Sequence, residues 1–133
     1  MKTAVDSSVI LAVLKHEADG PAWLDHLVEL RRGGRLVACD VVWAETAVAF
    51  PKAQDHAAAL ERLGVEFSPL NEESAALAGQ LCLAYRTGGG KRERIVGDFM
   101  IGAHAIVQAE QLLTADQGFF RKHFRGLTVA GLG

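Results

Sequence analysis

Short apolar runs alternate with helical patterns along the chain. The runs are rich in Val, Leu and Ala and predict strands at Thr3–Val5, Arg35–Cys39, Val65–Phe67, Gln111–Thr114 and Leu127–Val129. Apolar residues between the runs recur at helical spacing and predict helices over Ser7–Lys15, Pro21–Leu30, Val41–Phe50, Lys52–Leu63, Glu72–Arg86 and Phe99–Gln108. We expect Asp40 and Asn71 to cap the helices that follow them and Gly64 to end the helix before it.

Strands that alternate with helices predict βαβ units. The fold class is therefore α/β, with a central parallel sheet of four to five strands flanked by helices on both faces. No internal repeat or long linker interrupts the pattern, so residues 1–133 form one expected domain. Sites in such sheets lie beyond the carboxyl ends of the strands, and the residues that follow each strand are the ones to inspect.

Composition and charge exclude several classes of protein. With 14 basic and 16 acidic residues, the net charge of −2 argues against binding nucleic acid through bulk positive charge, although it leaves a nucleic-acid enzyme open. Cys39 and Cys82 form no C-x-x-C pair, so we expect two reduced thiols rather than a zinc or redox motif. No run of apolar residues is long enough for a membrane span or a signal peptide, which predicts a cytoplasmic protein with no membrane partner.

Four acidic residues occupy positions where a carboxylate suggests chemistry. Asp6 and Asp116 come at or just after the carboxyl ends of predicted strands, and Asp98 opens an almost wholly apolar helix. Glu45 lies within the Val41–Phe50 helix beside apolar neighbours, where an unpaired carboxylate is costly.

The four acids together predict a divalent metal site. Carboxylates gathered at one edge of a sheet repel one another, and a hard cation bound through oxygen ligands, Mg²⁺ or Mn²⁺, removes that repulsion. Taken singly, Asp6 and Asp116 also suit loop caps, Asp98 a helix cap and Glu45 a half-exposed helix residue. The metal hypothesis therefore depends on their coincidence.

The segments that hold these acids resemble PIN-domain nucleases in order and spacing over essentially the whole chain. The four similar segments are Val5–Leu11 around Asp6, Val42–Ala47 around Glu45, Gly97–Ala105 around Asp98 and Leu113–Phe120 around Asp116. The small size of the chain is similar to that of VapC-type toxins of toxin–antitoxin pairs. Thr114 matches a Ser or Thr often found beside the fourth acid, whereas Ser7 stands where many members have Thr.

This resemblance implies a three-layer PIN-like fold and a Mg²⁺- or Mn²⁺-dependent endoribonuclease. It implies that Asp6, Glu45, Asp98 and Asp116 are the catalytic, metal-binding acids, with Thr114 and Ser7 in supporting positions. It also implies RNA as substrate, products with 5′-phosphate and 3′-hydroxyl ends, an antitoxin protein as partner, and a homodimer. We expect Asp6, Asp98 and Glu45 to be the main ligands, with Asp116 acting through water or orienting the nucleophile.

Basic residues near the third and fourth acids are candidates for RNA binding. They are Arg86, Lys91, Arg92 and Arg94 before Asp98, and Arg121 and Lys122 after Asp116. Each also suits an ordinary solvated surface. Trp23, Trp43 and Tyr85 could stack on bases, but the apolar patterns around Trp43 and Tyr85 favour core positions.

Alternatives to a toxin remain open from sequence. One is a PIN nuclease of RNA processing, and another is a binding module that keeps the fold and recognises RNA or a protein without cleavage. Two features are rejected: Gly90-Lys91 lacks the Ser or Thr of a phosphate-binding loop, and Ser8 stands where an aspartyl phosphatase needs its second Asp. The helices Glu72–Arg86 and Lys52–Leu63 are candidate dimer surfaces.

Overall fold

In the computed structural model, which describes residues 1–133, helices surround a five-stranded parallel sheet. The strands are β1 (Lys2–Val5), β2 (Arg35–Ala38), β3 (Val65–Phe67), β4 (Gln111–Leu113) and β5 (Val129–Ala130). The helices are α1 (Ser7–Leu14), α2 (Gly20–Arg32), α3 (Asp40–Ala47), α4 (Ala53–Leu63), α5 (Glu72–Thr87), α6 (Val96–Gln108) and α7 (Gln117–His123). The α/β class and the parallel sheet predicted from the sequence are confirmed.

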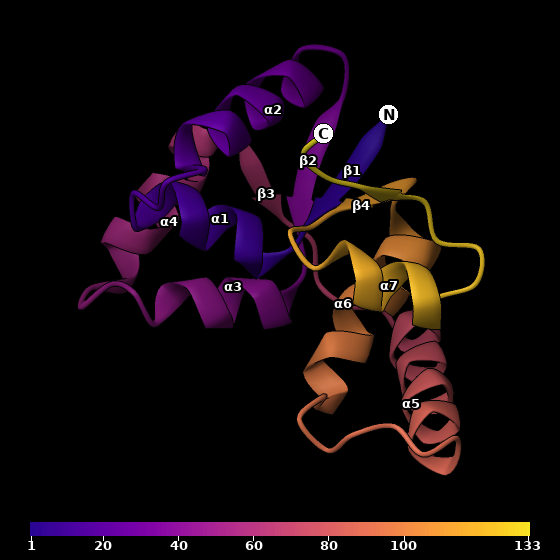
Figure 1. The fold of residues 1–133 in the computed structure, drawn as a ribbon. Helices are drawn as coiled ribbons and strands as arrows, with labels where there is room; N and C mark the ends of the chain where they lie inside the picture. Colours follow the sequence, from indigo (N-terminus) through magenta and orange to yellow (C-terminus); the bar gives the residue numbers. More distant parts are fainter.

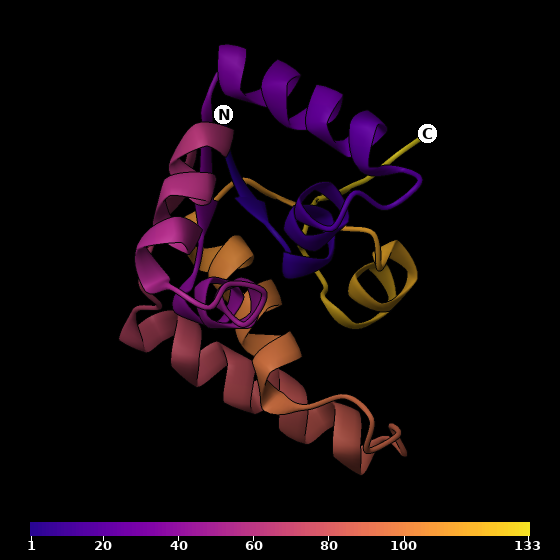
Figure 2. The ribbon, with the colours of Figure 1, turned by 90° about the vertical axis from the view of Figure 1, so that its left-hand side faces the viewer.

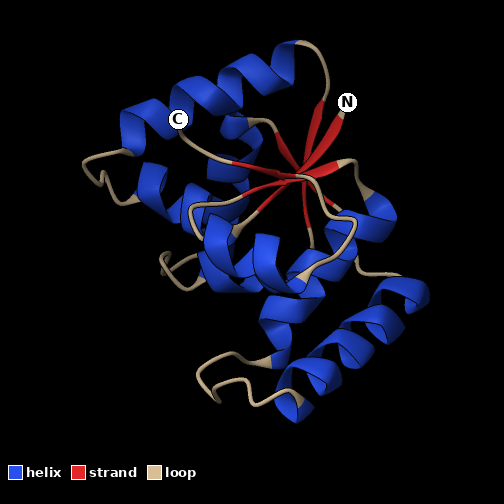
Figure 3. Cartoon of the chain, turned by 45° about the vertical axis from the view of Figure 1, so that its right-hand side comes forward, coloured by secondary structure: helices blue, strands red, loops and turns tan.

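The strand order is β3-β2-β1-β4-β5, so the direction of winding reverses at β1. Ala4 in β1 is in register with Val37 of β2 on one side and with Leu112 of β4 on the other. Figure 1 shows α1 to α4 on one side of the sheet and α5 to α7 on the other, and Figure 3 shows the strands fanning out between them. The carboxyl ends of β1 and β4 therefore meet at the topological switch point, where α/β sheets place their sites.

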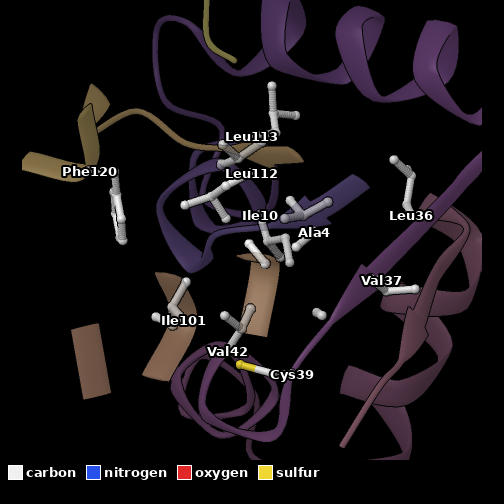
Figure 4. Packing of buried hydrophobic residues seen from close by; sticks show 14 of the residues in the cluster. Ala4, Ile10, Leu36, Val37, Cys39, Val42, Ile101, Leu112, Leu113 and Phe120 are labelled. Carbon is white, nitrogen blue, oxygen red and sulfur yellow. The ribbon is translucent and has the colours of Figure 1, made fainter. Parts of the chain in front are cut away.

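A continuous apolar core holds the helices against the sheet. Figure 4 shows strand residues Ala4 and Leu112 gathered with Ile10 from α1, Val42 from α3 and Ile101 from α6. The central strands β1, β2 and β4 are buried on both faces, which explains why they consist of nearly continuous apolar runs rather than alternating ones. Figure 2 shows α5 and α6 side by side beneath this core, where they extend beyond the sheet.

The strand and helix boundaries largely follow the sequence pattern, with four main differences. Helix α3 ends at Ala47 rather than Phe50. Helix α6 begins at Val96 rather than Phe99, so Asp98 lies in its first turn instead of opening it. The segment after Asp116, where no helix was predicted, forms α7, whose Phe119 and Phe120 are buried. The last strand, expected at Leu127–Val129, is Val129–Ala130.

Two of the three expected helix signals are confirmed. Asn71 caps α5, its side chain accepting a hydrogen bond from the Ser74 amide at 2.8 Å. Gly64 ends α4 at a φ of 76°, a left-handed conformation that favours glycine. The prediction for Asp40 is wrong, because the helix already includes it and its carboxylate accepts a bond from the Leu70 amide in a distant loop.

The aromatic and sulfur-containing side chains mostly belong to the core. Trp23 is 2% exposed and its indole N–H is bound to Asp19, so it cannot stack on a base. Trp43 and Tyr85 are partly buried against the core, and Cys39 and Cys82 are buried free thiols. No helix has the length and apolar character needed to cross a membrane.

Candidate acidic site at the sheet switch point

Asp6 lies at the centre of the candidate site. It follows β1 directly and precedes α1, and only 6% of it is exposed. Its carboxylate makes no capping bond to α1. Instead, Oδ2 accepts hydrogen bonds from the hydroxyls of Thr114 at 2.8 Å and Ser8 at 2.9 Å. The side chain of Asp6 therefore does not act as a loop cap, which was the alternative that its position in the sequence allowed.

Glu45 reaches the same edge from α3. Its Oε1 accepts a hydrogen bond of 2.9 Å from the hydroxyl of Ser7, which also lies 3.5 Å from Asp6 Oδ1. Ser7 therefore bridges the two carboxylates. Glu45 is exposed, although its apolar neighbours in the sequence predict a position beside the buried side of the helix. Its Oε2 accepts no hydrogen bond from the protein.

One carboxylate oxygen of Asp98 holds the start of a helix, and the other is free to bind a ligand. Because α6 starts at Val96, Asp98 is the third residue of the helix, and its Oδ2 accepts the Ile95 amide at 3.1 Å. The helix-cap alternative is thus part of its role. Its Oδ1 has no protein donor, and the residue is half-buried.

Asp6, Glu45 and Asp98 lie close enough for their negative charges to interact. Burial raises the pKa of Asp6, hydrogen bonds from Thr114 and Ser8 oppose the rise, and the charge of Asp98 adds to it. Partial removal of the Glu45 carboxylate from water also raises its pKa, although the residue is exposed. The negative charges of Asp6 and Asp98 add to this rise. None of the ion pairs of the protein includes these three acids.

Asp116 differs from the other three acids because it has a cationic partner. Arg94 Nη1 donates a hydrogen bond of 2.6 Å to Asp116 Oδ2. The guanidinium also lies 3.9 Å from the centroid of the Phe119 ring, which fixes its plane. The expectation that four unneutralised acids gather is therefore corrected to three, with the fourth paired. Arg94, a candidate RNA ligand, faces this acid.

Two hydroxyls tie the strand ends together. Thr114 donates to Asp6 and accepts the Asp116 amide at 2.9 Å, so one side chain positions two of the acids. Ser8 donates to Asp6 and accepts the Ala115 amide at 3.1 Å. Ser8 was not predicted to be a site residue. Its only sequence signal is a hydroxyl two residues after the acid that ends β1.

The chemistry of the donors fits a hard divalent cation. Asp6 Oδ1 has only the long contact with Ser7, while Glu45 Oε2 and Asp98 Oδ1 have no protein donor, so each acid keeps an oxygen for a ligand. Such oxygens are the ligands that Mg²⁺ and Mn²⁺ prefer. No three His, Cys, Asp or Glu side chains gather into a group that could hold a metal. The fit therefore depends on donor chemistry rather than on a preformed cage.

The six candidate RNA-binding residues separate into four places. Arg86 and Arg92 line one hollow, and Lys91 and Lys122 line the next. Arg94 lies at the acids, and Arg121 donates a hydrogen bond of 3.3 Å to the Val129 carbonyl of β5.

The fold and site together define a three-layer α/β domain with carboxylates at the switch point of a parallel sheet. The sequence matches the model of the PIN domain over residues 3–124, and the chain belongs to this family. A search of curated proteins found no match.

Solved structures with the same fold come from several bacteria. A chain of VapBC2 from Rickettsia felis, bound to a DNA fragment from its promoter, matches with a TM-score of 0.78 and 17% identity, covering 100% of both chains. A chain of VapBC-1 from nontypeable Haemophilus influenzae has a TM-score of 0.72 and 19% identity over 98% of both chains. VapBC-5 from Mycobacterium tuberculosis, a toxin–antitoxin system, gives 0.60 and 20% identity over 98% of this chain and 97% of that one. At these identities the likeness shows the fold alone.

Proposed function

We propose that this protein is a Mg²⁺- or Mn²⁺-dependent endoribonuclease that hydrolyses phosphodiester bonds of RNA. The observation that carries the proposal is the group formed by Asp6, Glu45 and Asp98 at the switch point. None of these three acids takes part in an ion pair, and Glu45 Oε2 and Asp98 Oδ1 have no protein donor. Membership of the PIN-domain family supports the same assignment.

Asp6, Glu45 and Asp98 would hold the metal. A bound divalent ion would lower the pKa of a nearby water molecule and would neutralise the negative charge that develops on the phosphate. Asp6 is the rigid member, because Thr114 and Ser8 fix its orientation. Glu45, exposed and bound only to Ser7, is free to adjust its position.

Asp116 has a different role from these three ligands. Thr114 binds its amide and Arg94 binds its carboxylate, so it is the acid that the protein itself neutralises. It would orient the attacking water or contact the metal through water. Arg94 keeps further N–H donors that suit a phosphate oxygen next to the acids.

We further propose that the enzyme is the toxin of a type II toxin–antitoxin module and acts in the cytoplasm as a homodimer. The support is the fold shared with chains of VapBC complexes. Growth arrest on expression, relieved by the product of an adjacent small reading frame, tests the toxin role against RNA processing. Light scattering of the purified chain tests the dimer.

End-group analysis of the cleaved RNA tests the proposed chemistry. A labelled single-stranded RNA is incubated with the protein and Mn²⁺, and with the protein and EDTA. The proposal expects fragments with 5′-phosphate and 3′-hydroxyl ends in Mn²⁺ and intact RNA in EDTA. Cyclic 2′,3′-phosphate ends, or cleavage in EDTA, would contradict it. Binding of RNA without any cleavage would favour the binding-module alternative.

A further inference from the structure

Unpaired basic residues gather along a groove between the end of α5, the following loop and α7. The central hollow, of about 440 Å³, is lined by Tyr85, Gly88, Gly89, Gly90, Lys91, Lys122 and His123 among others. It shares Gly90 with a hollow lined by Arg86 and Arg92, and Lys122 with a third that reaches Arg125. Figure 1 shows this loop and α7 on the same side of the molecule.

The charges of the groove are neither neutralised nor bonded to the protein. Its five Lys and Arg side chains, Arg86, Lys91, Arg92, Lys122 and Arg125, are all exposed, and none takes part in an ion pair. No acidic residue lines any of the three hollows. In a chain of net charge −2, this is a local excess of positive charge on a concave surface. Such a surface suits a chain of phosphates.

Aromatic contacts hold the two sides of the groove in place. Gly90 lies so close to Tyr85 that an added Cβ would come within 2.4 Å of the ring, which draws the loop onto α5. On the other side, the Tyr85 ring meets that of His123 in α7, with the centroids 4.9 Å apart. Tyr85 is therefore a shared floor and is not available to stack on a base.

The same contacts connect the groove to the acidic site. The ring of His123 lies 5.3 Å from that of Phe119, on which Arg94 stacks while it binds Asp116. The charges of Lys122 and Arg94 contribute, after burial, to lowering the pKa of His123, which agrees with a positive potential along this path. The end of the groove at His123 is thus joined through the Phe119 ring to Arg94, and no acidic residue lines the three hollows.

We propose that this groove binds the phosphate backbone of single-stranded RNA and leads it to the acidic site. The inference rests on the proposed function for the identity of the polyanion. The groove has no free aromatic ring on which a base could stack, and its charged side chains are all Lys or Arg. Its contacts with RNA are therefore to the phosphates. Binding is therefore salt-sensitive and tolerant of base sequence.

The test is the salt dependence of RNA binding when cleavage is prevented. A fluorescein-labelled oligouridine of twelve nucleotides is titrated with the protein in EDTA, at several salt concentrations, and followed by anisotropy. Lys91→Gln combined with Lys122→Gln should reduce the slope of log affinity against log salt by about 1.4, since each single-strand phosphate contact contributes about 0.7. Arg86→Gln combined with Arg92→Gln should have the same effect.

Lys15→Gln combined with Lys52→Gln is the matched control. These lysines follow α1 and precede α4, on the opposite side of the molecule in Figure 1, and removing them should leave the slope unchanged. Equal slopes for the wild type and both groove variants would overturn the proposal. So would a loss of antitoxin binding with unchanged RNA binding, which would make the groove a protein interface.

The outcomes separate this inference from the proposed function. Groove-dependent binding by a protein that never cleaves RNA in Mn²⁺ would support the groove and contradict the nuclease. Metal-dependent cleavage with the same KM in the wild type and the Lys91 and Lys122 variant would support the nuclease and overturn the groove.

Discussion

Arg94 Nη1 donates a hydrogen bond of 2.6 Å to Asp116 Oδ2, joining the loop before α6 to the end of β4 across 22 residues of sequence. This pair distinguishes Asp116 from Asp6, Glu45 and Asp98, which have no basic partner. A cation in contact with Asp116 would therefore share this acid with a guanidinium already present.

Replacement of Arg94 should strengthen metal binding. Arg94→Gln removes a positive charge next to the site, and repulsion between a unit charge and a divalent ion about 8 Å apart in water is about 1 kcal/mol, or about fivefold in affinity. Calorimetric titration with Mn²⁺ in the absence of RNA measures the change. Arg92→Gln, in the same loop but lining the groove, is the control and should bind Mn²⁺ like the wild type. An unchanged or weakened affinity in Arg94→Gln would show that the pair does not compete with the metal.

Thr114 should stabilise the fold through the bonds it makes to two acids. Thr114→Val keeps the shape of a fully buried side chain but removes the donor to Asp6 and the acceptor for the Asp116 amide. We expect a loss of about 1–3 kcal/mol in the free energy of unfolding, measured with urea. Thr128→Val changes an exposed residue and should cost far less. Equal effects of the two substitutions would mean that the hydroxyl network carries no stability.

The metal-free protein should gain stability when Asp6 is made neutral. Burial raises the pKa of Asp6. The contribution of this carboxyl group to the free energy of unfolding is therefore fully present below its ordinary pKa of about 3.9, and it is lost as the pH rises through the raised pKa. Urea unfolding in EDTA should therefore show Asp6→Asn gaining on the wild type as the pH increases above about 4. Saturating Mn²⁺ should reverse the order, because only the wild type gains binding energy. A constant difference at every pH would contradict the sign of the shift.

Gly102 should be intolerant of a side chain. A Cβ there would lie 2.1 Å from Phe124 Cε1 within the buried face of α6, so Gly102→Ala should destabilise the protein by about 1–3 kcal/mol. Gly79 lies in α5 with no atom within 4 Å of an added Cβ. Gly79→Ala should instead stabilise the helix by up to about 1 kcal/mol. Thermal unfolding of the two variants distinguishes these opposite signs.

The strands, most helices and the positions of the four acids could be predicted from the sequence, because each depends on local pattern. Buried parallel strands are apolar throughout, and acids that follow them stand out. Helix α6 was predicted three residues too short because Ile95, Val96 and Gly97 favour a strand or a turn locally. Burial of Gly97 and Phe99 and the bond from the Ile95 amide to Asp98 override that preference.

The features that the sequence could not supply depend on contacts between distant segments. Helix α7 is short, and the burial of Phe119 and Phe120 among other aromatic rings stabilises it more than any capping signal. The Arg94–Asp116 pair and the bond from Ser8 to the Ala115 amide join residues far apart in sequence. No spacing rule relates such residues. The sequence therefore could not show that Asp116 is paired with a cation while the other three acids are in no ion pair.

Cleavage of RNA by the Asp98→Asn variant tests the central claim most directly. Asparagine can still accept the Ile95 amide, so the start of α6 is retained while one negative ligand is removed. With single-stranded RNA and Mn²⁺ we predict a rate at least about a hundredfold below that of the wild type. Asp55→Asn, in the exposed first turn of α4, should cleave normally. Equal rates for Asp98→Asn and the wild type, in a reaction that EDTA stops, would contradict the assignment of this site.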